Sequence, residues 1–234
     1  MGGGGGRLTP NDYIQNGLVS MFDGEWNSGV NLHSNSPSVW IDLVSNNDLN
    51  IMTSNVNVGD NYFQNTSYSS CIAYKNGIIP CGTQEIVMQV DDYDPAKSAF
   101  VIANNVISYR GNFHWSYNIF SALMTGSLDR ETRSYFNYPI TDRGIHTCSA
   151  SGLTESPVAT CMMDGALQTG SRTTIGRNGS AGYFVLGGLD PEQKIYGTKC
   201  KIFCVRLYNR DLSTDEMLFN QHIDNIRFNL GLSI

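Results

Sequence analysis

Two carboxylates, Asp129 and Glu131, are spaced for acid–base chemistry. They alternate in the segment LDRET, so an extended backbone would present both carboxyl groups on one face. The same composition is typical of a solvated turn, which would leave them without a catalytic role. The four histidines are dispersed, and no serine or cysteine stands beside a recognisable base.

Asp91, Asp92 and Asp94 form the densest oxygen cluster of the sequence, in VDDYDP. Carboxylate oxygens are the ligands that calcium prefers, although such a run is also typical of a solvated acidic turn. The three residues match no fixed ligand spacing. We therefore assign no metal site and expect no cofactor, and we leave calcium open to a melting test.

Six cysteines are scattered along the chain, at Cys71, Cys81, Cys148, Cys161, Cys200 and Cys204. They show no CxxC or Cys/His zinc spacing. Cys200 and Cys204 would lie roughly 13 Å apart on one strand, too far to form a disulfide. We expect buried thiols, which pack as small hydrophobic side chains. If the protein is exported, Cys71 with Cys81 is the first disulfide to test.

Aromatic side chains supply the candidate ligand-binding residues. Phe113, Trp115 and Tyr117 alternate in NFHWSYNIF, so they share one face of an expected strand and would make a flat platform for sugar rings. The alternative is that this face belongs to the core, with His114, Ser116 and Asn118 outside. Trp26, in DGEWNSG, is expected on an exposed loop, although it could equally cap the core. The candidate binding residues are therefore Trp26, Trp115 and Tyr117.

Strands are predicted through most of the chain, because short runs of β-forming residues alternate with turn signals. The expected strands are Glu85 to Val90, Ala99 to Tyr109, Phe113 to Phe120, Thr132 to Ile140, Gly144 to Ser149, Val158 to Met163 and Tyr183 to Gly188. Expected turns are Arg110-Gly111-Asn112, Asp164-Gly165 and Asn178-Gly179. We expect an all-β protein, a two-sheet antiparallel β-sandwich.

The segment from Tyr196 to Phe228 is the most regular of the sequence. Lys199 to Tyr208 alternates strictly and carries apolar residues on both faces, which predicts an inner strand. Ser213 and Glu216 form a capping box at the start of a short C-terminal helix. Five apolar residues then recur at helical spacing and are expected to dock on the body of the protein; they are Met217, Leu218, Phe219, Ile223 and Ile226.

This segment resembles the closing motif of laminin G-like, or concanavalin A-like, jelly-roll domains of bacterial surface and phage proteins. The matching residues are Val205, Arg206, Leu207, Tyr208, Asn209, Arg210, Leu212, Ser213, Glu216, Asn220, Asp224, Arg227 and Phe228. Asp12 to Gly24 and Trp40 to Leu43 resemble the opening strands of that family. The resemblance implies one concanavalin A-like domain over residues 11–234. The run of glycines at residues 2–6 predicts, by its composition, a flexible glycine-rich arm at residues 1–10.

Glycoside hydrolases of that fold carry their carboxylates as E-x-D-x-x-E on one strand. This pattern is missing, because Ile86 and Val87 follow Glu85 and the aspartates from Asp91 onward come too late. We therefore expect that the chain is not an enzyme.

Charge and hydropathy limit the partners. The net charge is −6 and no basic stripe is visible, which argues against nucleic acid. No apolar run approaches the roughly 20 residues that span a bilayer, so we expect no membrane insertion. The sequence shows no secretory signal peptide, yet the family resemblance implies an extracellular, cell-surface or virion location.

Two functions fit these observations. The first is a non-catalytic carbohydrate-binding or adhesion module, with a glycan or a cell-surface protein as its partner. The second is a structural protein of a virion or surface appendage that forms a homo-oligomer or a larger assembly without binding glycans. The fold alone does not decide between them.

Overall fold

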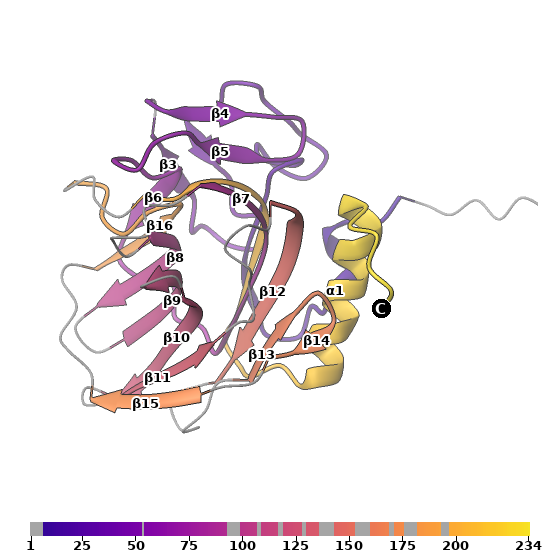
Figure 1. The fold of residues 1–234 in the computed structure, drawn as a ribbon. Helices are drawn as coiled ribbons and strands as arrows, with labels where there is room; N and C mark the ends of the chain where they lie inside the picture. The colour runs from indigo at the N-terminus through magenta and orange to yellow at the C-terminus, as the bar shows by residue number, and fades with distance from the viewer. Residues whose placement is uncertain are drawn as a thin grey trace, which may run out of the picture.

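The computed structural model describes residues 7–52, 54–92, 99–106, 109–116, 119–127, 130–135, 143–152, 160–168, 171–175, 182–192 and 197–234. Side chains are described outside 105–142 and 171–175. The expected antiparallel two-sheet sandwich with a C-terminal helix is confirmed (Figure 1).

The first sheet has eight strands. Their order is β14 (Ala166–Leu167), β13 (Thr160–Met163), β12 (Ile145–Ser151), β7 (Thr83–Asp92), β17 (Lys199–Tyr208), β5 (Phe63–Asn65) and β4 (Val56–Val58), and β1 (Leu18–Asp23) also pairs with β17. The central position of β17 confirms the inner strand predicted from its two apolar faces. The two-residue turn expected at Asp164 and Gly165 joins β13 to β14, and both residues have positive φ, at 52° and 81°.

The second sheet has nine strands. Their order is β15 (Ser171–Ile175), β11 (Arg130–Tyr135), β10 (Ile119–Ser127), β9 (Tyr109–Ser116), β8 (Ala99–Val106), β16 (Tyr183–Leu186), β6 (Ala73–Asn76), β3 (Leu49–Ile51) and β2 (Val39–Trp40). All pairings between the named strands of both sheets are antiparallel.

Three expectations for the second sheet were wrong. Ala99 to Tyr109 is not one strand, because β8 ends at Val106 and β9 begins at Tyr109, with these two residues paired. Phe113 to Phe120 is not one strand, because β9 ends at Ser116 and β10 begins at Ile119, with these two residues paired. Arg110-Gly111-Asn112 is not a turn but part of β9. A glycine flanked by polar residues resembles a turn in sequence, whereas here pairing with strands on both sides keeps the segment extended.

The main core lies between the sheets. It is built around Trp40, Phe22, Phe63 and Phe184, all fully buried. The Trp40 ring lies 4.2 Å from the Phe63 ring, and its indole N–H donates to the Asp23 carbonyl at 3.0 Å. Burial of Trp40 therefore agrees with its expected structural role.

A bulge in β17 breaks the strict alternation that the sequence predicts. The pairing with β7 shifts register between Ile202 and Cys204. Cys200 and Ile202 face the main core, whereas Cys204 packs in a second apolar cluster with Phe203 beneath the C-terminal helix. The extra residue of a bulge rotates the following side chains to the other face.

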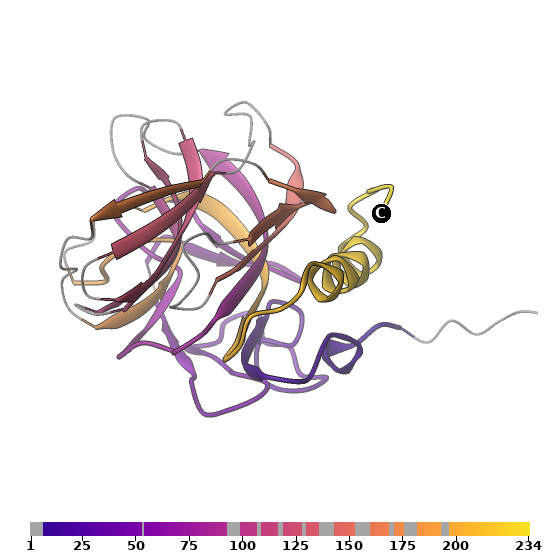
Figure 2. The same ribbon diagram turned by 90° about the horizontal axis from the view of Figure 1, so that it is seen from below.

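The C-terminal helix, α1 (Thr214–Phe228), packs on the outer face of the eight-stranded sheet, next to β12 and β13 (Figures 1 and 2). The predicted capping box is confirmed, since the Ser213 hydroxyl accepts from the Glu216 N–H at 3.2 Å and the Glu216 carboxylate accepts from the Ser213 N–H at 2.9 Å. Asn229 ends the helix in the left-handed conformation.

The docking face of α1 differs from the prediction. Met217 and Ile223 are buried as expected, but Leu218, Phe219 and Ile226 are exposed. The side chains that replace them against the sheet are polar: Asn220, Gln221 and Asp224, each fully buried. Apolar spacing failed as a guide because the sheet beneath the helix presents charged groups that these polar side chains satisfy.

Candidate binding site

The polar groups under α1 are centred on Arg206 of β17. Its Nε donates to Glu85 Oε2 on β7 at 2.8 Å, and its two terminal nitrogens donate to the two oxygens of Asp224 on α1, each at 2.7 Å. All three side chains are fully buried. One cation therefore joins two carboxylates from two different elements.

Neutral donors complete this arrangement. The Glu85 carboxylate accepts from Asn220 at 2.8 Å and from Ser149 at 3.0 Å, while Asp224 accepts from Tyr13 at 2.7 Å and from Thr147 at 2.6 Å. We call Arg206, Glu85, Asp224 and these four donors the Arg206 cluster.

Burial dominates the electrostatics of the Arg206 cluster. Loss of water raises the pKa of Glu85, although Arg206 opposes the rise. Burial would lower the pKa of Arg206, but the facing charges of Asp224 and Glu85 outweigh that effect and raise it well above its usual range. Burial likewise raises the pKa of the Tyr13 hydroxyl, and the Arg206 guanidinium lies over the Tyr13 ring, 4.0 Å from its centre. Since all three ionic side chains are sealed from solvent, the Arg206 cluster holds α1 on the sheet and does not receive a ligand.

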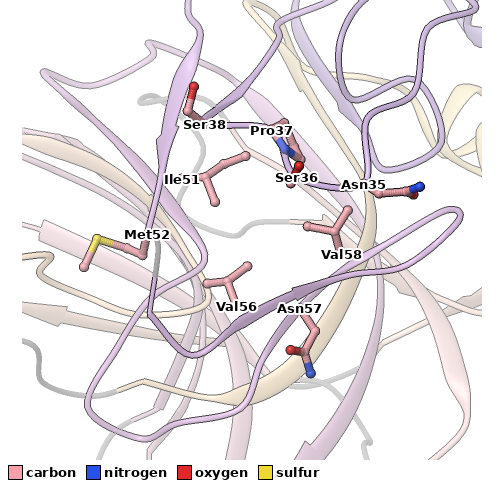
Figure 3. A pocket seen from close by; sticks show the side chains of 9 residues that line it. All are labelled: Asn35, Ser36, Pro37, Ser38, Ile51, Met52, Val56, Asn57 and Val58. Carbon is pink, nitrogen blue, oxygen red and sulfur yellow. The ribbon is translucent and has the colours of Figure 1, made fainter.

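A groove opens elsewhere, where the edge strands of the two sheets approach each other. It has a volume of about 590 Å³, within the range of small-ligand sites. β4 ends one sheet and β2 ends the other, with β3 beside it. The groove is lined by Asn35, Ser36, Pro37, Ser38, Ile51, Met52, Val56, Asn57 and Val58 (Figure 3). We call it the edge groove.

The floor of the edge groove is aliphatic. Ile51, Val56 and Val58 are partly buried and pack against the main core, and Figure 3 shows their side chains around a common space. Val56 and Val58 share one face of β4 because side chains alternate along a strand. The floor is therefore fixed by the same residues that close the sandwich.

The rim of the edge groove is polar and exposed. Asn35, Ser36 and Ser38 precede β2, and the His33 ring lies 3.2 Å from the Asn35 side-chain oxygen. On the other side, Asn57 points away from the aliphatic space and donates to Gln64 at 3.3 Å. Amide and hydroxyl groups around an aliphatic floor can hydrogen-bond a polyhydroxylated ligand and contact its C–H groups.

Trp26, the described aromatic candidate from the sequence, does not line this groove. Trp26 is only 6% exposed, so the expectation of an exposed loop ring was wrong. The carboxylate of Asp23 fixes the loop by accepting from the backbone N–H groups of Glu25 and Trp26, and this turns the ring inward. The side chain of Trp115, and Tyr117 altogether, lie outside the described residues, so their roles stay predictions.

Of the remaining sequence candidates, Asp91 and Asp92 are the ones whose side chains the structure describes. Asp91 and Asp92 accept from Gln64 and Tyr68, respectively, and Asp94 lies outside the described residues, as do Asp129 and the side chain of Glu131. Where the chain is described, no group of three or more His, Cys, Asp or Glu is placed to hold a metal ion.

All six cysteines are buried thiols, as predicted. Cys71 and Cys81, the pair to test for a disulfide if the protein is exported, are both free thiols in this structure. Cys71 packs in a small outer cluster with Phe100 and Val185, whereas Cys81 packs in the main core.

The residues that line the edge groove include no aromatic ring and no carboxylate, so their sequence pattern does not indicate a binding site. The signal available was the run SNSPS at residues 34–38, whose composition is typical of an exposed loop. The sequence did not predict that residues 34–38 lie close to β4, since these residues lead into β2, which belongs to the other sheet.

No protein-family model and no curated protein matches this chain. Solved structures do. The Trypanosoma rangeli sialidase in complex with sialic acid has a TM-score of 0.64 and 15% identity, over 90% of this chain and 33% of the sialidase. The receptor-binding domain of botulinum neurotoxin D has a TM-score of 0.61 and 10% identity, over 90% of this chain and 54% of that one.

The chain shares a β-sandwich fold with these proteins. At such low identity the likeness shows the fold alone, and it is consistent with a lectin-like sandwich. The chain spans about a third of the sialidases and about half of the toxin chains that it matches.

The sialidase matches contradict the expectation that this chain is not an enzyme. That expectation depended on the missing E-x-D-x-x-E pattern, whereas sialidases are glycoside hydrolases that use a tyrosine nucleophile. One of the matching structures is a sialidase covalent intermediate with 2,3-difluorosialic acid. The absent pattern therefore does not exclude glycoside hydrolysis.

Among the described residues, no helix has the length and hydropathy needed to span a bilayer.

Proposed function

We propose that this protein is a carbohydrate-recognition module with a concanavalin A-like sandwich, and that the edge groove binds the glycan. The observation that carries the proposal is the composition of the groove, with amide and hydroxyl side chains around the aliphatic floor of Ile51, Val56 and Val58. Fold neighbours named for sialic acid and receptor binding support a recognition role.

The proposed binding mode needs no metal ion. Asn35 and Ser38 would exchange hydrogen bonds with sugar hydroxyls at the rim, and the aliphatic floor would contact the C–H face of the ring. An extracellular, cell-surface or virion location and a glycan or cell-surface protein partner agree with this function and stay predictions with it.

A glycan array probed with and without calcium tests the proposal. We expect binding to at least one class of glycan, and we expect the double change Asn35→Ala with Ser38→Ala to weaken it about thirtyfold, because each of the two lost hydrogen bonds contributes roughly 1 kcal/mol. Asn76→Ala is the matched control, since Asn76 is an exposed amide on β6 outside the groove lining.

Two results would overturn this proposal. One is an array that stays blank under both conditions. The other is a glycan signal that the groove variant and the Asn76→Ala control retain equally.

The second candidate is the assembly function, in which the chain packs against other copies of itself. Its supporting observation is the exposed apolar face of α1, carried by Leu218, Phe219 and Ile226. This observation is independent of the edge groove, which lies at the opposite edge of the eight-stranded sheet from β14.

A further inference from the structure

The lining of the edge groove carries no charge. Its residues are two asparagines, two serines, one proline, one methionine, one isoleucine and two valines, and none of these side chains ionises near neutral pH. Asparagine and serine side chains each hold at least one donor and one acceptor. The groove therefore offers donors and acceptors together, and its lining holds no cation for an anionic ligand.

The open edge of β4 adds main-chain groups beside the groove. The Gly59 N–H donates to the Tyr62 carbonyl at 2.9 Å, so these two residues form a hydrogen-bonded pair. Bonded and non-bonded pairs alternate along an antiparallel ladder, which makes Val58 and Val56 non-bonded positions whose N–H and C=O groups point away from β5. Because β4 is the last strand of its sheet, no described strand pairs with these groups.

The main chain of β4 also borders the groove. Val56, Asn57 and Val58 are consecutive lining residues, yet Figure 3 shows the Asn57 side chain pointing away from the aliphatic space. Asn57 therefore lines the groove through its main chain. β4 is only three residues long, and so short an edge offers little pairing to an extended peptide. Its N–H and C=O groups suit sugar hydroxyls, each of which both donates and accepts.

The charge behind β4 is negative. Asn57 donates to Gln64 at 3.3 Å, and Gln64 donates to the Asp91 carboxylate at 2.8 Å. Lys201 of β17 is separated from β4 by β5, and its ammonium group donates to Gln89 on β7, at 3.3 Å, on the side away from β4. An anion in the groove would therefore gain no attraction from this side.

The imidazole of His33 lies at the opposite rim, in the segment that leads into β2. One ring nitrogen lies 3.0 Å from the Glu25 carbonyl oxygen, and the other lies 3.2 Å from the side-chain oxygen of Asn35. Both nitrogens are thus engaged by neighbouring groups of the chain. The ring orients the Asn35 amide at the rim and does not present a nitrogen to a ligand anion.

We infer that the edge groove selects uncharged sugars over acidic ones, a selectivity that rests on the glycan-binding function proposed above. The hydroxyls of a neutral sugar can pair with the rim amides and serines and with the open edge of β4. A carboxylate only accepts hydrogen bonds, so it would face the main-chain carbonyls of β4 as a repulsive partner. Discrimination comes from the cost of taking a carboxylate out of water without a cation to receive it.

Matched oligosaccharides test this selectivity. The members of each pair differ in one end group, a hexose in one and the corresponding hexuronic acid in the other, and calorimetry measures both affinities. We expect the neutral member to bind about tenfold more tightly or better. Ser36→Lys places an ammonium group at the rim and should raise the acidic-to-neutral affinity ratio about tenfold. Asn76→Lys, at an exposed amide of β6 outside the groove lining, is the matched control and should leave the ratio unchanged.

The β4 edge has its own test. Val58→Pro removes an outward N–H that does not pair with β5, so it should weaken binding of the neutral member about fivefold while the chain stays folded. Val58→Ala shortens the same side chain but keeps the N–H, so it should bind more tightly than Val58→Pro. Circular dichroism and the melting temperature check that both variants are folded.

The outcomes separate the selectivity from the proposed function. If neither member of any pair binds, both are wrong. If acidic members bind as tightly as neutral ones, or if Ser36→Lys leaves the ratio unchanged, glycan binding stands and the selectivity is wrong. Equal affinities of Val58→Pro and Val58→Ala would exclude the main-chain contribution of β4.

Discussion

Arg206 on β17 and Asp224 on α1 are joined by two parallel hydrogen bonds of 2.7 Å, both between fully buried atoms. A bidentate guanidinium–carboxylate pair fixes direction as well as distance. The same guanidinium also holds Glu85 on the neighbouring strand. Arg206 therefore joins α1 to two neighbouring strands of the sheet, β17 and β7.

Removal of Arg206 should be among the most damaging single changes in this chain. Arg206→Ala leaves Glu85 and Asp224 buried without their cation, and we expect a loss of about 3–5 kcal/mol in the free energy of unfolding. Urea unfolding followed by circular dichroism measures it. Arg210→Ala is the control, because Arg210 forms a partly exposed pair with Glu216 and should cost about 1 kcal/mol or less. Equal losses in the two variants would contradict a central role for Arg206.

Glu216 should make stability depend on pH in the acid range. The hydrogen bonds from Arg210 lower its pKa from 4.5 to about 2 in the folded chain. Folding therefore favours the ionised form, so the stabilisation is complete above about pH 4.5 and is lost as the pH falls toward 2. Glu216→Gln should lower stability at neutral pH by about 1 kcal/mol and flatten this dependence.

Melting temperatures measured between pH 2 and 7 test the Glu216 prediction. Asp60→Asn removes an exposed carboxylate from the connection between β4 and β5 and serves as the control. If Glu216→Gln keeps the full acid dependence of the unaltered chain, the Arg210 pair is not its source.

Gly24 should tolerate no larger residue. A Cβ atom there would lie 2.4 Å from the carbonyl oxygen of Asn61 and 2.8 Å from the Cα of Tyr62, which are backbone atoms that cannot move aside cheaply. Gly24→Ala should therefore cost about 1–3 kcal/mol. Gly77→Ala is the comparison, because Gly77 has φ of +80° but open space around it and should lose only about 1 kcal/mol. Thermal unfolding ranks the two, and a smaller loss for Gly24→Ala would refute the steric argument.

The cysteines should react only after unfolding. Burial raises the pKa of the Cys71 and Cys81 thiols to about 12 each, so little thiolate exists near neutral pH. A disulfide-exchange reagent should report six thiols in denaturant and slow reaction in the native state. Fewer than six thiols per chain in denaturant, or a lower mass consistent with lost hydrogens, would show that disulfides form in the purified protein.

Several parts of the fold could be predicted from the sequence because their causes are local. The strand Lys199–Tyr208, the capping box at Ser213 and the turn at Asp164 and Gly165 all follow from residues within a few positions of one another. The polar residues that match the closing motif, among them Arg206, Asn220 and Asp224, could be recognised as a pattern in the sequence. The sequence did not predict that these residues are buried together.

The edge groove shows why the candidate site could not be predicted. Ser38 and Val58 are separated by nineteen intervening positions and belong to different sheets, so only the packing of the two sheets brings them to one groove. Trp26 is a residue whose sequence context was misleading. Its polar neighbours predict an exposed ring, but hydrogen bonds from the backbone N–H groups of Glu25 and Trp26 to the Asp23 carboxylate hold the loop in a conformation in which the ring is buried.

The sequence by itself therefore determined the all-β sandwich, its inner strand and the start and type of its last helix, because alternation, turn residues and capping act over short distances. Only the tertiary structure decided which face of that helix is buried. Apolar spacing favoured Leu218, Phe219 and Ile226, but the buried charges of Glu85 and Arg206 require polar partners, and burying an unsatisfied charge costs more than exposing three apolar side chains.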